Sequence, residues 1–247
     1  MIIALISDVH ANLTALEAVL TSAQGLGAEA IWNAGDFVGY GPDPNEVVSR
    51  LRNLDALHVA GNYDRKVLRV PELMQKWMTD GLTLRHRAFI WAYQTLTEEN
   101  RQWLANLPDR CRFDREGFPI LLTHGSPESI SEHLDTRTSF ERLVELSKLT
   151  DAKLIVTGHS HKPYSRQIRN TWFINPGSVG RSDDGDPRAS YAILHLSPAQ
   201  VSVDLMRVPY NTSAVADRLV AQNQPLQFKE MFLRGVSLSQ VLQEEAQ

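Results

Sequence analysis

Residues that bind divalent metals recur at six places in this chain of 247 residues. Histidine nitrogens and the oxygens of aspartate and asparagine are common ligands of zinc, manganese and related ions. A dinuclear hydrolytic centre needs imidazoles, a bridging carboxylate and a water-bearing position on each ion, so these residue types predict metal-assisted hydrolysis of a phosphate ester. The six segments are Asp8-Val9-His10, Gly35-Asp36, Gly61-Asn62-Tyr63-Asp64, Thr123-His124-Gly125, Gly158-His159-Ser160-His161 and Asn175-Pro176-Gly177-Ser178.

Five of these segments follow apolar runs that are typical of buried strands. Asp8 and His10 come after the run 2–6, and side chains two residues apart lie on one side of a strand, so both can reach one ion. In open α/β sheets the sites are built at the ends of the strands. We therefore expect the five segments to meet at such an edge. The other four runs, 30–32, 56–60, 119–123 and 152–157, precede Asp36, Asn62, His124 and His159.

Each motif has an ordinary explanation when it stands alone. An Asp-x-His pair is a weak signal, and two histidines in a loop such as Gly-His-Ser-His are often only solvated. Five polar clusters after five separate apolar runs are harder to explain in that way, and the combination favours a metal site. Glycines beside the ligands leave the backbone free to turn sharply near an ion or a phosphate. They are Gly35, Gly61, Gly125 and Gly158.

This series of motifs resembles the calcineurin-like metallophosphoesterase superfamily, and especially its compact bacterial members related to diadenosine tetraphosphatases and phosphodiesterases. The resemblance covers residues 1 to 208 and is most detailed in the segments 7–20 and 35–42. It implies that one metal ion is held by Asp8, His10 and His161, that Asp36 bridges to a second ion, and that this second ion is held by Asn62, His124 and His159.

The chain departs from the family's fullest pattern at Tyr63, where many members have a histidine that is thought to protonate the leaving group. A tyrosine with a reference pKa near 10 is a reluctant acid at neutral pH, so poor alkoxide leaving groups should suffer most. His133 is an alternative proton donor. Asp64 either orients Asn62 or Tyr63, or caps a turn. The catalytic residues that we predict are Asp36, Asn62, Tyr63 and Asp64.

Three functions agree with these residues. The first is a phosphoesterase in which two divalent ions generate a bridging hydroxide that attacks a phosphodiester, a nucleotide or another activated phosphate. The second is a serine/threonine protein phosphatase of the same superfamily, and the third is a scaffold that keeps the fold without turnover, as the retromer subunit resembling these enzymes does. The ligand types suit manganese, iron, zinc, nickel or cobalt alike. Arginines that can bind a phosphate are Arg65, Arg181 and Arg188.

Composition is typical of a cytoplasmic enzyme. The chain has 43% hydrophobic and 22% charged residues and a net charge of −4, which argues against an extended nucleic-acid surface. We expect a small phosphorylated substrate such as a nucleotide, and the sequence is compatible with a homo-oligomer. Cys111 cannot form an internal disulfide, because it is the single cysteine. No apolar stretch reaches the roughly 18 residues that a membrane span needs.

Early strand–helix alternation followed by strand-rich sequence predicts an α/β (α+β) fold in one domain, residues 1–247. The pattern suggests two mixed β-sheets face to face with helices outside, and the family resemblance implies the same four-layer αββα sandwich. A helical insertion is expected at 67–107 and a helical C-terminal extension at 210–247. Aromatic residues in the insertion form either core or an interface, or a cap over the substrate. The further elements that we expect are helices at 13–23, 44–53 and 139–149 and strands at 111–113, 164–168, 171–174, 191–196 and 201–208.

Overall fold

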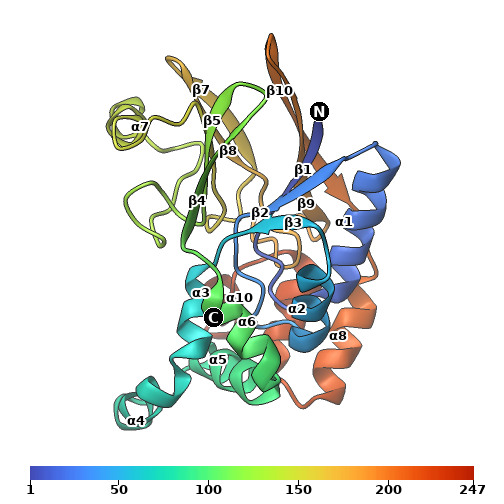
Figure 1. Cartoon of the computed structure of the whole chain (residues 1–247). Coiled ribbons are helices and arrows are strands. Elements are labelled where there is room, and N and C mark those ends of the chain that lie inside the picture. The colour runs from blue at the N-terminus through green and yellow to red at the C-terminus, as the bar shows by residue number, and fades with distance from the viewer.

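The computed structural model describes residues 1–247 and contains two five-stranded sheets (Figure 1). The strand order is β10-β9-β1-β2-β3 in the first sheet and β4-β5-β6-β8-β7 in the second. The first sheet comprises β1 (Ile2–Ile6), β2 (Ala30–Asn33), β3 (Ala56–His58), β9 (Ala189–Ser197) and β10 (Gln200–Val208). The second comprises β4 (Arg110–Arg115), β5 (Phe118–Thr123), β6 (Leu154–Val156), β7 (Tyr164–Ile168) and β8 (Thr171–Asn175).

Parallel pairing at the centre of each sheet gathers the strand ends. Strands β1, β2 and β3 are parallel neighbours, and so are β5, β6 and β8, while β9 and β10 join the first sheet and β4 and β7 the second in antiparallel pairs. The carboxyl ends of parallel strands emerge at one edge of a sheet. The residues just beyond them therefore start close together, as the sequence predicts. These residues are Asp8, Asp36 and Asn62 in the first sheet and His124 and His159 in the second.

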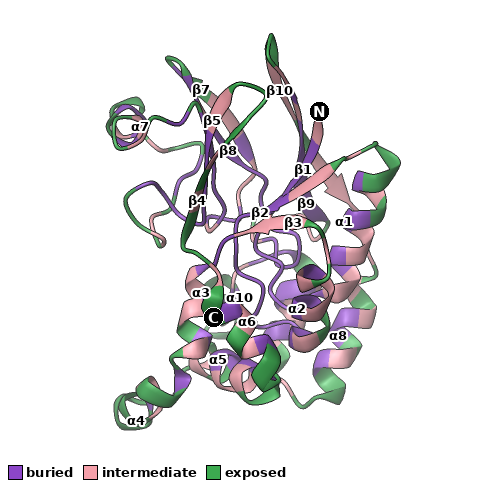
Figure 2. Ribbon diagram, viewed as in Figure 1, coloured by how far each residue is buried: buried purple, intermediate pink, exposed green.

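Helices cover the outer faces of the two sheets, and the four-layer αββα sandwich is confirmed. Helix α1 (Leu13–Gly25) and α2 (Pro44–Arg52) pack on the first sheet, and α7 (Phe140–Ser147) packs on the second. Between the sheets lies a cluster of 13 buried side chains that includes Leu5 and Ile174. Figure 2 shows the burial concentrated in the inner strands and the loops at their ends. No helix is both long and apolar enough to cross a membrane.

Helix α1 begins where its sequence predicts. Asn12 precedes the helix, and its side-chain Oδ1 accepts the Ala15 N–H at 3.0 Å, so one of the unpaired amides of the first turn is satisfied. The apolar residues Leu16, Val19 and Leu20 recur at helical spacing and are buried against the first sheet. Burying a leucine contributes about 1.5–3 kcal/mol. The helix therefore fixes the loop that carries Asp8 and His10 in front of it.

Two helical regions extend the sandwich on the side of the strand ends. The first begins at Asn62, five residues before the predicted insertion, because Asp64 caps the helix start at Gly61. Its aromatic residues Trp77 and Phe89 are buried together with the side chains of α1 and α2. These two aromatic residues of the insertion therefore belong to the core. The first region comprises α3 (Asn62–Leu68), α4 (Val70–Asp80), α5 (Leu84–Thr95) and α6 (Glu98–Asn106), and the second comprises α8 (Thr212–Ala221), α9 (Leu226–Arg234) and α10 (Leu238–Glu245). The division into one domain with an insertion and an extension stays a prediction.

Gly180 is the point where the loop after β8 touches the loop after β1. Its N–H donates to the Asp8 carbonyl at 3.0 Å, and its own carbonyl accepts from Asn12 Nδ2 at 2.9 Å. A Cβ at this position would lie 1.8 Å from the Val9 carbonyl oxygen, which is backbone and cannot move aside cheaply. Glycine is required here because the two loops approach so closely.

We expect Gly180→Ala to lower the free energy of unfolding by more than about 2 kcal/mol, a size typical of overpacking in a rigid environment. Gly25→Ala is the matched control, because a Cβ on this helical residue meets no atom within 4 Å. That substitution should be neutral or stabilise by up to about 1 kcal/mol. Urea unfolding of the two variants measures the difference, and equal stabilities would show that the loop contact is not tight.

Candidate metal centre

Left-handed backbone turns present most of the predicted ligands. A positive φ is uncommon outside glycine and costs about 1–2 kcal/mol per residue. Such conformations persist where the surrounding structure enforces them, and they cluster at functional sites. Here the Asp8 N–H donates to the Gly35 carbonyl at 2.9 Å, so the two turns support each other. Five of the seven predicted ligands have this backbone, namely Asp8 (φ 55°), His10 (46°), Asp36 (57°), His159 (64°) and His161 (58°).

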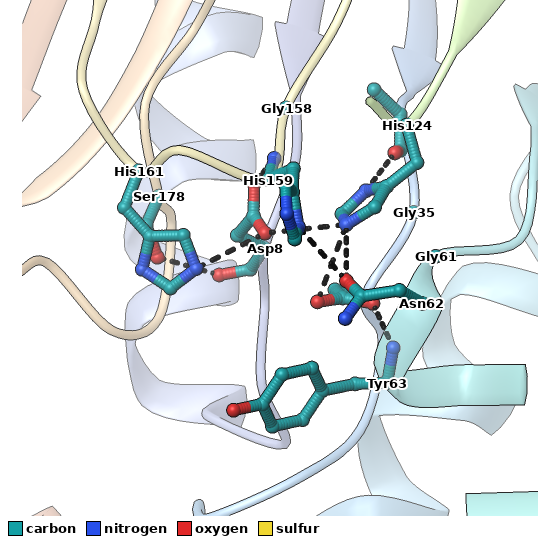
Figure 3. Close-up of polar contacts among 12 residues, drawn as sticks. Asp8, Gly35, Gly61, Asn62, Tyr63, His124, Gly158, His159, His161 and Ser178 are labelled. Carbon is teal, nitrogen blue, oxygen red and sulfur yellow. Dashed lines mark hydrogen bonds and ion pairs between the residues drawn. The ribbon is translucent and has the colours of Figure 1, made fainter. Parts of the chain in front are cut away.

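The first group of ligand atoms consists of Asp8, His10 and His161, which are all buried and have one donor atom each within 4.8 Å of the others. His161 Nε2 lies 3.2 Å from Asp8 Oδ1 and 3.1 Å from His10 Nε2. Figure 3 shows the His161 ring turned toward the Asp8 carboxylate. The structure thus brings together the three residues that are expected to hold the first ion.

The second group consists of Asp8, Asp36 and His124. Asp36 Oδ2 lies 3.4 Å from His124 Nε2 and 3.7 Å from His10 Nε2, which places this carboxylate between the two groups of histidines. Asp8 Oδ1 also belongs to both groups, since it lies 4.0 Å from His124 Nε2. Two carboxylates, and not Asp36 alone, therefore lie where a bridging ligand is needed.

Asn62 and His159 complete the second group. Asn62 Oδ1 lies 2.9 Å from His124 Nε2 and 2.9 Å from His159 Nδ1. Asn62 is the first residue of α3, whereas His124 and His159 follow β5 and β6 of the other sheet. Both sheets therefore contribute donors to one space, and all seven predicted ligands meet there. Figure 3 shows five of them, Asp8, Asn62, His124, His159 and His161.

Hydrogen bonds to backbone carbonyls orient the imidazoles. A carbonyl oxygen only accepts, so each ring nitrogen that contacts one carries the proton, and the other nitrogen of the neutral ring keeps its lone pair. His159 uses Nε2 toward the Ser131 carbonyl at 3.0 Å, which leaves Nδ1 facing Asn62. The other three rings use Nδ1, from His10 to Val38 at 3.3 Å, from His124 to Ala34 at 2.7 Å and from His161 to Arg181 at 2.7 Å.

The ring nitrogens that do not face a carbonyl point at other electron-rich atoms. His10 and His161 present Nε2 atoms 3.1 Å apart, and His124 Nε2 and His159 Nδ1 each lie 2.9 Å from Asn62 Oδ1. Such contacts require positive charge between the atoms, and at His161 Nε2 an Arg181 N–H supplies part of it at 3.3 Å. Asp8 Oδ1 is buried and has no hydrogen-bond partner. A buried, unpaired carboxylate oxygen costs free energy unless a positive charge compensates it. Divalent cations satisfy all of these atoms at once, so the residues fit a metal centre.

Charge interactions inside the cluster shift the pKa values of its members. Burial opposes ionisation of Asp8, yet the neighbouring imidazoles, His161 foremost, hold the pKa of this carboxyl well below its usual range. Burial likewise disfavours the charged form of His124, but Asp36, with Asp8 and the Ala34 carbonyl, outweighs it and raises the pKa to about 9, so a proton occupies the Asp36 side of this ring at neutral pH until a cation displaces it. Burial lowers the pKa of His159 to about 3. The carboxylates attract positive charge strongly in this water-poor space.

Asp64 organises the backbone beneath the cluster. Its carboxylate accepts the N–H of Asp36 at 3.0 Å and of Gly61 at 2.8 Å, and the N–H groups of Phe37 and Val38 at 2.9 and 3.3 Å. Burial and the charge of Asp36 raise the pKa of Asp64 to about 7, against the effect of these N–H donors. Asp64 therefore caps α3 and also fixes the loop of Asp36 through main-chain hydrogen bonds.

Tyr63 lies beside the cluster and supports it. Its backbone N–H donates to Asp36 Oδ1 at 2.7 Å, and its ring stands edge-on to the His10 ring with centroids 5.0 Å apart. The phenol donates to the Tyr40 hydroxyl at 3.3 Å. Burial raises the pKa of Tyr63 above its usual range, so the phenol is an even weaker acid than a free tyrosine.

A cavity of about 200 Å³ opens from this cluster. Asp36, Asn62, His159 and His161 line it together with Tyr40, Tyr63, His133 and Arg181. The remaining lining residues were not predicted, because nothing in the spacing of α5, of the loop after β8 or of the start of α10 relates them to the ligands. They are Arg85, Asp183, Ser237, Leu238 and Ser239.

The other residues singled out in the sequence have supporting positions. Arg65 pairs with Asp109 and Arg188 with Asp186, and neither arginine lines the cavity. The loop after β8 braces the ligand loops, because Ser178 Oγ donates to the Asp8 carbonyl at 2.7 Å. Asn175 Nδ2 donates to the Gly158 carbonyl at 2.6 Å in the same way.

Comparison with known proteins agrees with this geometry. Residues 1–198 match the family model described as a calcineurin-like phosphoesterase superfamily domain. A crystal structure of a metallophosphoesterase from Sphaerobacter thermophilus is 32% identical, with a TM-score of 0.78 and coverage of 96% of this chain and 99% of that chain. An uncharacterized protein from Methanocaldococcus jannaschii is 31% identical, with coverage of 94% and 98%. The phosphodiesterase YfcE of Escherichia coli is 27% identical, with coverage of 76% and 84%. The chain therefore belongs to the calcineurin-like phosphoesterase superfamily and is a metal-dependent hydrolase.

Proposed function

We propose that this protein is a dinuclear phosphoesterase that hydrolyses a small phosphodiester or a nucleotide. The observation that carries the proposal is the convergence of seven side-chain donor atoms on one buried space, where nitrogen and oxygen lone pairs lie within about 3 Å of one another. In this proposal Asp8, His10 and His161 hold one divalent ion, Asn62, His124 and His159 hold the other, and Asp36 lies between them. Manganese, iron, zinc, nickel and cobalt all suit these ligands.

The residues of the chain supply the rest of the site. When bound, divalent ions supply Lewis acidity toward a phosphoryl oxygen and lower the pKa of water. The carbonyl contacts of the imidazoles keep each lone pair in place, and the Tyr63 N–H holds Asp36 Oδ1 so that Oδ2 faces the histidines. Such fixed donors lower the cost of reorganisation during the reaction. The Tyr63 phenol is a poor acid, so the leaving group must depart without much protonation from it.

The size of the cavity favours a small substrate over a phosphorylated protein loop. The cavity holds about 200 Å³ and is bounded by α5 and the start of α10. A protein phosphatase requires an open cleft that accepts an extended chain. The phosphodiesterase YfcE, at 27% identity, supports activity on diesters. Turnover of a phosphopeptide faster than of a small aryl phosphodiester would favour the protein phosphatase instead.

We expect Asp36→Asn to reduce kcat/KM by at least about 1,000-fold, because the amide removes a negative charge from the position between the two ions. Bound metal should fall to one equivalent or less. Asp80→Asn is the control, since Asp80 is exposed on α4. Elemental analysis and turnover of bis(p-nitrophenyl) phosphate measure both effects. Full activity with two bound ions in the Asp36 variant would contradict the assignment.

The rate should depend steeply on the leaving group. We expect an aryl phosphodiester to be hydrolysed at least about 100-fold faster than an alkyl phosphomonoester, because general-acid assistance of about that size is missing at Tyr63. Tyr63→His should raise the rate for the alkyl ester and change the rate for the aryl ester little. Steady-state kinetics on the two proteins provides the test. Equal rates for both esters in the natural protein would show that another group protonates the leaving oxygen.

A further inference from the structure

Two arginines line the cavity without a carboxylate partner. Arg85 lies in the first turn of α5, and Arg181 lies in the loop after β8. Neither guanidinium has a carboxylate oxygen within 4.0 Å, whereas Arg65 and Arg188 are paired in this way. Unpaired arginines at the wall of an active-site cavity provide hydrogen-bond donors for an anion.

Arg181 is the inner of the two and is nearly fully buried. The residue is 9% exposed, and its Nε atom is buried without any hydrogen-bond partner. The guanidinium lies over the Tyr40 ring at 4.9 Å from the centroid, and Nη2 lies 3.3 Å from His161 Nε2. Burying a charge without a counter-charge is costly. An anion that enters the cavity therefore gains from Arg181 as well as from the proposed ions.

Arg85 is the outer of the two and stands where the cavity continues. A second cavity of about 300 Å³ shares Arg85, Leu238 and Ser239 with the first one. Leu238 and Ser239 begin α10, whose first turn contains no acidic residue, so its free N–H groups also favour negative charge. A ligand that extends from the proposed ions toward the outer cavity passes Arg181 and then Arg85.

The carboxylates of the cavity do not cancel this positive charge. Asp183 also lines the cavity, and its buried Oδ1 has no hydrogen-bond partner. Asp8 and Asp36 are taken up by the proposed ions. The positive charge of two divalent cations and two arginines therefore exceeds the negative charge of the three aspartates. The remaining positive charge can neutralise a second anionic group besides the scissile phosphate.

Building on the proposed function, we propose that Arg85 and Arg181 form a subsite for a second anionic group of the substrate. The preferred substrates then carry a further phosphoryl or carboxylate group on the leaving-group side, close to the scissile phosphate. The scissile group lies at the proposed ions, the second anion lies between the two arginines, and the remainder of the leaving group extends into the outer cavity.

Binding calorimetry on the metal-loaded protein tests this subsite with ligands that are not hydrolysed. Methylphosphonate carries one anionic group, methylenediphosphonate adds a second phosphoryl group, and phosphonoacetate adds a carboxylate. The three probes are titrated into the natural protein, into Arg85→Gln, and into the control Arg87→Gln. Arg87 is exposed on α5 and lines neither cavity. All titrations use the same free metal concentration, so the affinity of each probe for metal cancels when the proteins are compared.

We expect at least one of the two-anion probes to bind the natural protein about tenfold more tightly than methylphosphonate, as charge-assisted hydrogen bonds to a guanidinium imply. Arg85→Gln should remove most of this advantage while methylphosphonate affinity changes less than about twofold. Arg87→Gln should preserve the advantage. The probe with the larger advantage identifies the second group as phosphoryl or carboxylate.

Two results would overturn the subsite. Either both two-anion probes bind no better than methylphosphonate, or their advantage persists unchanged in Arg85→Gln. Tight binding of methylphosphonate without such an advantage would leave the proposed function intact. If methylphosphonate does not bind and no phosphate ester is hydrolysed, the proposed function fails, and the subsite fails with it.

Discussion

The arrangement of the site depends on the hydrogen bonds that Asp8 accepts through its carboxylate and its main-chain carbonyl. Its Oδ2 accepts the His159 N–H at 3.0 Å, and its main-chain carbonyl accepts Ser178 Oγ and the Gly180 N–H. The loops after β1, β6 and β8, which come from two different sheets, are thereby fixed to one residue. Only Oδ1 is left without a hydrogen bond, and it faces both groups of histidines. A positive charge at that atom links the stability of the loops to the binding of metal.

The helices outside the sandwich enclose the cavity at the proposed metal centre. A strand edge alone exposes ligands to solvent, whereas α5 and α10 place Arg85 and the residues around Leu238 opposite the ligands and leave a cavity of about 200 Å³. The C-terminal helices reach this position because Phe228 and Met231 pack with Tyr40, which follows the proposed ligand Asp36 along the chain. Elements outside the strands therefore form this wall of the cavity, while the proposed metal ligands come from the loops at the strand ends and the start of α3.

Much of the fold was predictable from local signals. The apolar runs specified the strands that precede the ligands, and the capping residue Asn12 specified the start of α1. The parallel strands predicted a meeting of the seven proposed ligands at the strand ends, but not which of these ends belong to each of the two sheets that lie face to face. The cap that Asp64 forms was one of its predicted roles, but its hold on the loop of Asp36 and the positions of Arg85 and Ser239 could not be predicted. Asp64 acts through four main-chain amides that the sequence does not reveal, and the other two residues reach the cavity only through tertiary packing of helices far apart in the chain.

The most direct test of the central claim is a crystal structure of the metal-loaded protein with anomalous scattering measured at the edge of the bound metal. The account predicts two peaks, one among the donors of the first group and one among those of the second, with an oxygen of Asp36 between them. Crystals that contain a single ion, or ions bound away from Asp8 and Asp36, would contradict it.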